Sequence, residues 1–116
     1  MAVTLHASGT IDTTGQIDVE LTVVSIAIAG VFTVHIDFAA LAAGDVVESR
    51  IKRKILAGGT ARELIEPEVL YGAQALKPIW DSDVLGNDLS EADAVVVTIK
   101  QTFGAGRLLP YKVLRY

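Results

Sequence analysis

The sequence predicts an all-β protein, a single antiparallel β-sandwich of jelly-roll-like type with about eight strands over residues 1–116. Three observations predict this class. Apolar and polar residues alternate over several segments, turn-forming residues recur about every ten positions, and no segment keeps the spacing of an amphipathic helix. No linker divides the chain, so a single domain is expected.

The first predicted strand covers residues 17–23, where apolar side chains stand at every second position. Such alternation places them on one face of a half-buried strand. Residues 32–38 repeat the pattern with two aromatic and two β-branched side chains on one face, which predicts a core strand. Residues 25–30 are expected to turn the chain between the two strands, since Gly30 can adopt backbone angles that other residues avoid.

The third long strand is predicted over residues 46–56, and it ends at a glycine pair typical of a hairpin, Gly58 and Gly59. Its partner is predicted within residues 60–71. Pro67 interrupts this partner, because a proline cannot donate a hydrogen bond to a neighbouring strand. The segment is therefore expected to form an edge strand or a bend.

The last part of the chain contains three more predicted strands. A short strand is expected at residues 78–84, followed by a region rich in turn-forming residues. Residues 94–103 alternate strongly, with Val95, Val97, Ile99 and Phe103 predicted to face the core. The glycine-rich stretch 104–106 then turns the chain into the final strand, at residues 108–116.

The composition is rich in apolar residues for a domain of this length. Of the 116 residues, 51% are apolar and only 21% are charged. A domain of this size buries only about two-thirds of the surface that its unfolded chain exposes, so an apolar excess indicates surface covered by other subunits. The longest uncharged run, residues 21–36, is too short to span a membrane as a helix, and no membrane partner is expected.

Apolar residues at outward-facing or terminal positions are the predicted contacts with partner subunits, because an ordinary sandwich core would not absorb them. A basic run in the third strand is added to this set as a contact for an acidic neighbour. The predicted interface residues are Val24, Ile26, Ile28, Val31, Arg50, Lys52, Lys54, Val96, Leu108, Leu109 and Leu114.

The basic run allows a second interpretation. Alternation puts Arg50, Lys52 and Lys54 on one strand face, where they either contact an acidic partner or form a solvated face that discourages unwanted strand pairing. Arg53 falls on the opposite face, where it is expected either to lie near the end of the sheet or to pair with an acid such as Glu63 or Glu66. The net charge of −4 argues against nucleic acid as a partner.

Residues that usually carry catalysis are scarce. The chain has no cysteine and two histidines, and it lacks the lysine and spacing of a phosphate-binding loop. A triad of Ser49, His35 and Asp37 is conceivable, but no nucleophile elbow or oxyanion-hole sequence accompanies it. We therefore expect no enzymatic activity, no catalytic residues, no cofactor and no metal site.

Two further features have a functional and a structural interpretation. The acidic residues 81–93 offer oxygen ligands for an irregular calcium site, or they form an ordinary acidic turn. The aromatic residues Trp80, Tyr71, Tyr111 and Tyr116 either stack on sugars or bases, or serve the core and subunit contacts. The structural interpretation is favoured in both cases.

Two parts of the chain resemble small virion structural proteins of tailed bacteriophages. The first comprises residues 30–37 and 41–48, with the sequences GVFTVHID and LAAGDVVE. The second comprises residues 97–107 and 110–113, VTIKQTFGAGR and PYKV, and is similar to the C-terminal hairpin of that group.

The resemblance implies a non-enzymatic protein of the virion. Within that group the chain is most similar to a capsid decoration, or cement, protein, which binds and stabilises the shell of the major capsid protein. The implied partners are the major capsid protein and copies of the chain itself, as a dimer or trimer, at the capsid surface. A tail, neck or fibre-base module and a carbohydrate-binding β-sandwich module remain as alternatives.

Overall fold

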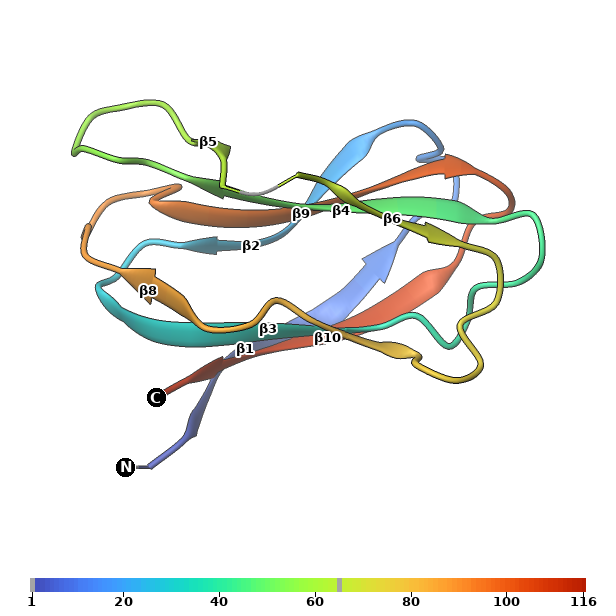
Figure 1. The fold of residues 1–116 in the computed structure, drawn as a ribbon, viewed down its shortest axis with the longest axis horizontal. Helices are drawn as coiled ribbons and strands as arrows, with labels where there is room; N and C mark the ends of the chain where they lie inside the picture. The colour runs from blue at the N-terminus through green and yellow to red at the C-terminus, as the bar shows by residue number, and fades with distance from the viewer. Residues whose placement is uncertain (1, 65) are drawn as a thin grey trace.

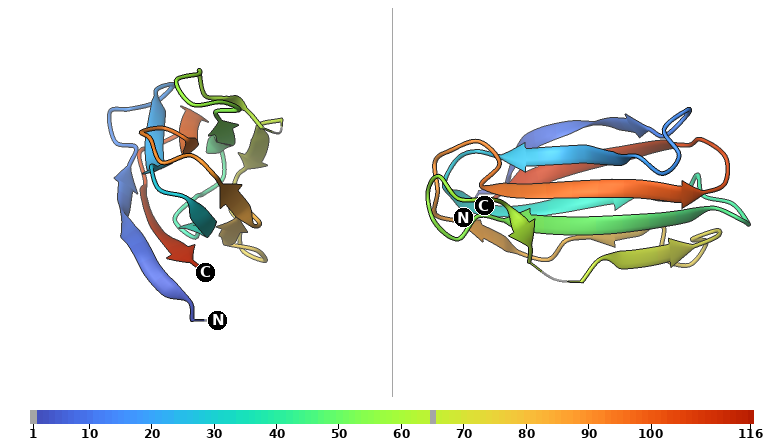
Figure 2. Two further views of the ribbon diagram at one scale, coloured as in Figure 1. Left: turned by 90° about the vertical axis from the view of Figure 1, so that its left-hand side faces the viewer. Right: turned by 90° about the horizontal axis from the view of Figure 1, so that it is seen from above.

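Two antiparallel β-sheets lie face to face in the computed structural model, which describes residues 2–64 and 66–116 (Figures 1 and 2). The regular structure within these two stretches is entirely β-strand, in ten strands. Both chain ends lie at the same end of the sandwich (Figure 1).

The lower layer in Figure 1 is sheet A, in which two short strands share one edge. In spatial order it consists of β1 (Thr4–Asp12), β10 (Leu108–Arg115) and β3 (Gly30–Asp37), with β7 (Ile79–Asp81) and β8 (Leu85–Asn87) both paired to β3. Between β7 and β8, Ser82 continues the pairing, because its side chain accepts the N–H of Val34 and its own N–H donates to the Val34 carbonyl. The two short strands therefore act as one interrupted edge strand.

The upper layer is sheet B, which is built in the same way. In spatial order it consists of β2 (Glu20–Ile26), β9 (Val95–Phe103) and β4 (Val46–Arg53), with β5 (Arg62–Glu63) and β6 (Glu68–Tyr71) both paired to β4. Pro67 lies between β5 and β6, as expected for a residue that interrupts an edge strand.

The chain alternates between the sheets in the order of a jelly roll. If β5 with β6 and β7 with β8 each count as one interrupted strand, eight strands remain. Their spatial orders are then 1-8-3-6 in sheet A and 2-7-4-5 in sheet B, the arrangement of two Greek keys. The predicted all-β, jelly-roll-like sandwich is confirmed.

The inner faces of the two sheets form one hydrophobic core. Alternate residues of β3 and β9 face each other across the sandwich, as the alternation predicts. Seven predicted core residues are at most 1% exposed, namely Phe32, Val34, Ile36, Phe38, Val95, Val97 and Ile99.

A β-bulge in β2 turns two predicted interface residues into the core. Thr22 pairs with Thr98 and Val24 pairs with Val97, so β2 has one more residue than its partner between these pairs. The extra residue shifts the alternation by one position, and Val24 and Ile26 join the hydrophobic core. The prediction that both face outward is wrong, and a partner subunit has no access to them.

Two other predicted interface residues are also buried. Leu109 pairs with Ile11 in β1 and lies fully inside the core, so its prediction as an outward residue is wrong. Val96 points to the outer face of sheet B as predicted, but residues 59–61 and Lys52 line the same groove and leave Val96 almost covered. Neither residue is available to a partner.

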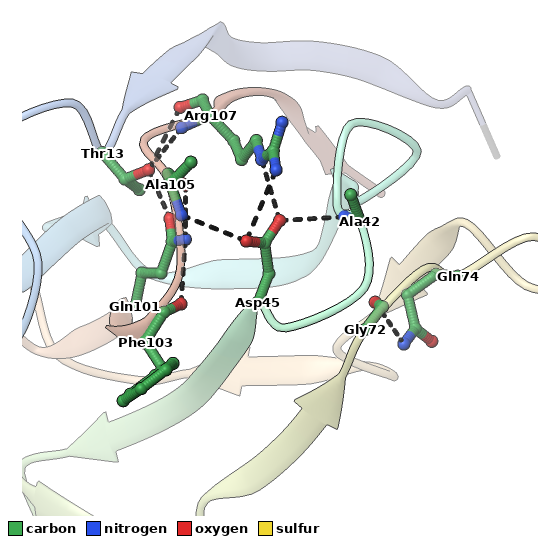
Figure 3. Close-up of polar contacts among 9 residues, drawn as sticks. All are labelled: Thr13, Ala42, Asp45, Gly72, Gln74, Gln101, Phe103, Ala105 and Arg107. Carbon is green, nitrogen blue, oxygen red and sulfur yellow. Dashed lines mark hydrogen bonds and ion pairs between the residues drawn. The ribbon is translucent and has the colours of Figure 1, made fainter.

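A buried carboxylate joins the loops at the end of the sandwich away from the chain termini (Figure 3). Asp45 accepts hydrogen bonds from the backbone N–H of Ala42 (2.8 Å), the backbone N–H of Ala105 (3.2 Å) and Nε of Arg107 (2.8 Å). Its backbone carbonyl accepts the N–H of Gly72 at 2.8 Å. We call this set of contacts the Asp45 clasp.

Two side chains extend the clasp to the loop after β1. The N–H of Arg107 donates to the hydroxyl of Thr13 at 2.7 Å, and that hydroxyl donates to the side chain of Gln101. The amide of Gln101 in turn donates to the carbonyl of Ala105 at 2.7 Å. A side chain at Gly104 would collide with Asp45, so the β9–β10 turn needs glycine there. Four chain segments therefore meet at one buried polar cluster.

The clasp changes the acidity of its carboxylate. Burial by itself raises the pKa of Asp45, because it disfavours the charged form. The hydrogen bonds from Ala42, Arg107 and Ala105 outweigh this effect, and the pKa lies below the ordinary value of 3.8. The folded state therefore stabilises the ionised carboxylate.

We expect Asp45→Asn to lower the free energy of unfolding by about 1–3 kcal/mol, because buried donors lose their charged acceptor. Urea denaturation measures the loss. Asp88→Asn is the control. Asp88 is exposed, and its ion pair with Arg53 is long, at 3.8 Å, so the change should affect stability little. An equal loss in both variants would contradict the role of the clasp.

The same variant has a pH signature. A depressed pKa stabilises the fold fully above the unfolded-state value, and this stabilisation disappears as the pH falls through the folded-state value. Below about pH 4 the wild type should lose stability more steeply than Asp45→Asn. Parallel pH profiles would contradict the ionised state of Asp45.

Candidate protein-binding surfaces

The basic run lies on the outer face of sheet B, where acidic side chains of the same chain neutralise it. Arg50 forms ion pairs with Glu48 at 3.0 Å and Glu63 at 3.1 Å. Lys52 pairs with Glu20 at 2.6 Å, and this hydrogen bond, followed by that from Thr98, lowers the pKa of Glu20. The charge of the strand is therefore compensated internally.

The remaining basic residues of the run are also paired. Nζ of Lys54 lies 3.6 Å from Glu91 and donates to the carbonyl of Ala92 at 2.8 Å. Arg53 is the last residue of β4, which confirms the first of its two interpretations, and it lies 3.8 Å from Asp88 rather than pairing with Glu63 or Glu66. A solvated ion-pair face explains Arg50, Lys52 and Lys54 without an acidic partner.

The conceivable catalytic triad is divided between the two layers. Ser49 is buried on the inner face of sheet B, whereas His35 and Asp37 lie on the outer face of sheet A. The His35 ring contacts Thr33 through Nε2 at 3.0 Å and Asp81 through Nδ1 at 3.8 Å. These residues form no nucleophile–base pair.

The acidic region at 81–93 uses its polar side chains to shape turns. The carboxylate of Asp81 accepts the N–H of Asp83 at 2.9 Å, and that of Asp93 accepts the hydroxyl of Ser25 at 2.6 Å. Asn87 donates to the carbonyl of Ile28 at 2.7 Å. No three histidine, aspartate or glutamate side chains in the described part of the chain come close enough to hold a metal ion together.

Trp80 is a core residue. Its ring packs in the hydrophobic cluster, and its Nε1 donates to Glu68 at 2.7 Å. A buried indole with its polar atom satisfied offers no surface for stacking on a sugar. Trp80 therefore does not support the carbohydrate-binding alternative.

The outer face of sheet A has an apolar patch near the chain termini. Leu114 pairs with Leu5 on one side, while the N–H of Tyr116 donates to the carbonyl of Val31 at 2.9 Å. Leu5 and Tyr116 are exposed, Val31 is 40% exposed and Leu114 is half-buried. We call these four residues the sheet A patch.

Four predicted interface residues keep accessible surface. Val31 and Leu114 belong to the sheet A patch, and Ile28 is exposed in the turn just before β3. Leu108 is exposed at the other end of β10. The prediction requires apolar side chains that stay accessible in the single chain, and these four positions meet that requirement.

An aromatic row crosses the outer face of sheet B at its other end. Val46 of β4 pairs with Tyr71 of β6 on one side and with Phe103 of β9 on the other. The Tyr71 and Phe103 side chains are 71% and 68% exposed. The row of three is therefore an open apolar strip, which we call the aromatic row.

Sequence alternation placed Phe103 in the core, and this prediction is wrong. Val46 pairs with Phe103 but Val47 pairs with Gln101, so β9 contains an extra residue, Thr102, at this point. This bulge reverses the direction of Phe103. No local sequence signal marks the bulge, and the turn that follows it is held by contacts of Ala105 with Gln101 and Asp45.

The Asp45 clasp positions the aromatic row. Val46 follows Asp45 directly, Tyr71 precedes Gly72, and Phe103 lies two residues before Ala105. Gly72 and Ala105 each donate a backbone hydrogen bond to Asp45. The backbone next to each of the three residues is thus tied to Asp45, through its carboxylate at Ala105 and through its backbone carbonyl at Gly72.

Comparison of the chain with family models, with curated proteins and with solved structures found no match. Residues 2–64 and 66–116 contain no helix of the length and apolarity needed to cross a membrane. The two apolar surfaces, on opposite outer faces of the sandwich, are the main candidates for function.

We expect Val34→Asp to prevent folding and Val31→Asp to leave a folded protein. The first change buries an unpaired charge in the core, at a cost of about 3 kcal/mol or more, whereas the side chain of residue 31 reaches solvent. Circular dichroism and thermal melting of the two variants compare the opposite faces of the same strand. Similar melting of both variants would contradict the assignment of faces.

Proposed function

We propose that this chain is a non-enzymatic virion structural protein that decorates and stabilises a capsid shell. The observation that carries the proposal is the exposed apolar surface on both outer faces of the sandwich. The sheet A patch and the aromatic row lie in different layers, so one molecule can contact two neighbours at once. A cement protein needs such a pair of contacts.

The chemistry of the surfaces supports a protein partner. Aromatic and large aliphatic side chains are enriched in the centres of protein interfaces, where burial from water provides the binding free energy. The basic residues beside the aromatic row are already neutralised by acids of the same chain. A phosphate-rich partner would find no free positive charge there.

The resemblance of residues 30–48 and 97–113 to virion structural proteins supports the capsid role. A tail, neck or fibre-base module would use the same surfaces with a different partner, which makes it the second candidate. The two roles differ in stoichiometry, because a decoration protein covers the shell whereas a tail or neck component occurs at one vertex.

Counting copies tests the proposal. In purified particles that contain this chain, quantitative mass spectrometry should give a copy number comparable to that of the major capsid protein. Such a count would support decoration. A handful of copies per particle would contradict it and favour the tail or neck component.

The aromatic row should contribute directly to shell binding. We expect the double variant Tyr71→Ser and Phe103→Ser to raise the dissociation constant for particles at least tenfold, a change of about 1.4 kcal/mol in binding free energy, and to lower occupancy accordingly. Leu76→Ser is the matched control, because Leu76 is 97% exposed and lies outside the row. Unchanged occupancy of a correctly folded double variant would exclude the row as the contact.

A further inference from the structure

We propose that the outer face of sheet A binds the same face of a second copy of this chain, forming a two-fold symmetric dimer. The second copy would cover the sheet A patch, one of the two apolar surfaces. The dimer is expected in solution with no shell present, whether or not the chain has a capsid role.

The centre of this face contains a pocket between β10, β3 and β7. The pocket has a volume of about 310 Å³ and a largely apolar lining. Lys112 pairs with His35 across β10 and β3, and Asp37 pairs with Ile79 across β3 and β7. The lining residues are His35, Asp37, Ile79, Pro110, Tyr111 and Lys112.

Two opposite charges stand at this pocket without neutralising each other. Within the described residues, Lys112 takes part in no ion pair, and neither does Asp37. One carboxylate oxygen of Asp37 accepts the N–H of Ala39 at 2.9 Å. The basic run on sheet B is different, because Arg50, Lys52 and Lys54 each have an acidic partner within the chain.

A second copy supplies the missing partners. Lys112 and Asp37 lie on adjacent strands. Lys112 pairs with His35, and the pair of Tyr111 with Ile36 separates it from the position of Asp37. A two-fold axis in the plane between two such faces can place each Lys112 opposite Asp37 of the partner subunit, and it then forms two equivalent ion pairs. A face with charges of only one sign would repel its own copy.

Apolar residues flank the charged centre on both sides. The sheet A patch lies toward the chain termini, and Ile79 and Pro110 lie toward the opposite end, all with accessible surface. When a second copy covers them, the apolar flanks exclude water from the ion pairs and strengthen them. The same contact removes the exposed apolar surface of Val31 and Leu5 from water.

The other charged groups that face the centre are compatible with this pairing. Nδ1 of His35 lies 3.8 Å from Asp81, and its other ring nitrogen contacts the hydroxyl of Thr33. Among the described residues that line the pocket, Lys112 and Asp37 are therefore the charged side chains without an ion pair. The dimer should weaken at high salt, because its specificity depends on ion pairs.

Sedimentation equilibrium of the purified chain with charge-reversal variants tests the dimer. The wild type should sediment at twice the 12.3 kDa of the single chain. Lys112→Asp and Asp37→Lys should each raise the dissociation constant at least tenfold, because each places like charges together. The double variant Lys112→Asp with Asp37→Lys should recover the dimer, because the exchanged charges attract again.

Controls separate pairing from misfolding. Lys100→Asp reverses a charge on sheet B and should leave the dimer intact. Asp37→Asn keeps a side-chain acceptor for the N–H of Ala39, so it should weaken the dimer in a chain that melts like the wild type.

Three results would overturn the inference: a monomeric wild type, a dimer that tolerates both single reversals, or a double variant that stays monomeric. The last two would place the contact elsewhere, for example along the free edge of β1. A monomeric wild type that still covers particles would overturn the dimer while leaving the capsid role standing.

Discussion

The buried carboxylate of Asp45 is the contact on which the end of the sandwich with the aromatic row depends. The carboxylate binds the loop before β4 and the turn between β9 and β10, and the backbone carbonyl of Asp45 binds the residue after β6. Gln101 and Thr13 extend the cluster to the loop after β1. An ionised group in this position stabilises the fold only while all of its donors are in place. The clasp therefore couples loop conformation to the position of the aromatic row.

Much of the fold follows from local alternation. The strands β3, β9 and β10 were predictable because apolar residues stand at alternate positions over much of each strand. The end of β4 was marked by the glycine pair Gly58 and Gly59, and Pro67 correctly indicated an interrupted edge. The strand β1 lacks such a signal, because its sequence TLHASGTID is dominated by small and polar residues. Its pairing with β10 depends on residues about a hundred positions away in the chain.

The candidate surfaces were less predictable because single-residue bulges decide them. One extra residue in β2 moves Val24 and Ile26 inward, and another in β9 moves Phe103 outward. Each bulge reverses the face of every residue beyond it in the strand, and neither has a local sequence signal. Which acids neutralise the basic run likewise depends on strand register. The sequence does not fix that register, so a face neutralised within the chain was only one of two interpretations.

Hydroxyl-radical footprinting of the free and particle-bound chain tests most directly whether the outer faces are contact surfaces. Tyr71 and Phe103 should be labelled in the free chain and protected in the bound one, since both rings are largely exposed in the single chain. Trp80 should resist labelling in both states because it is buried in the core. Equal labelling of Tyr71 and Phe103 in the two states would contradict a contact role for the aromatic row.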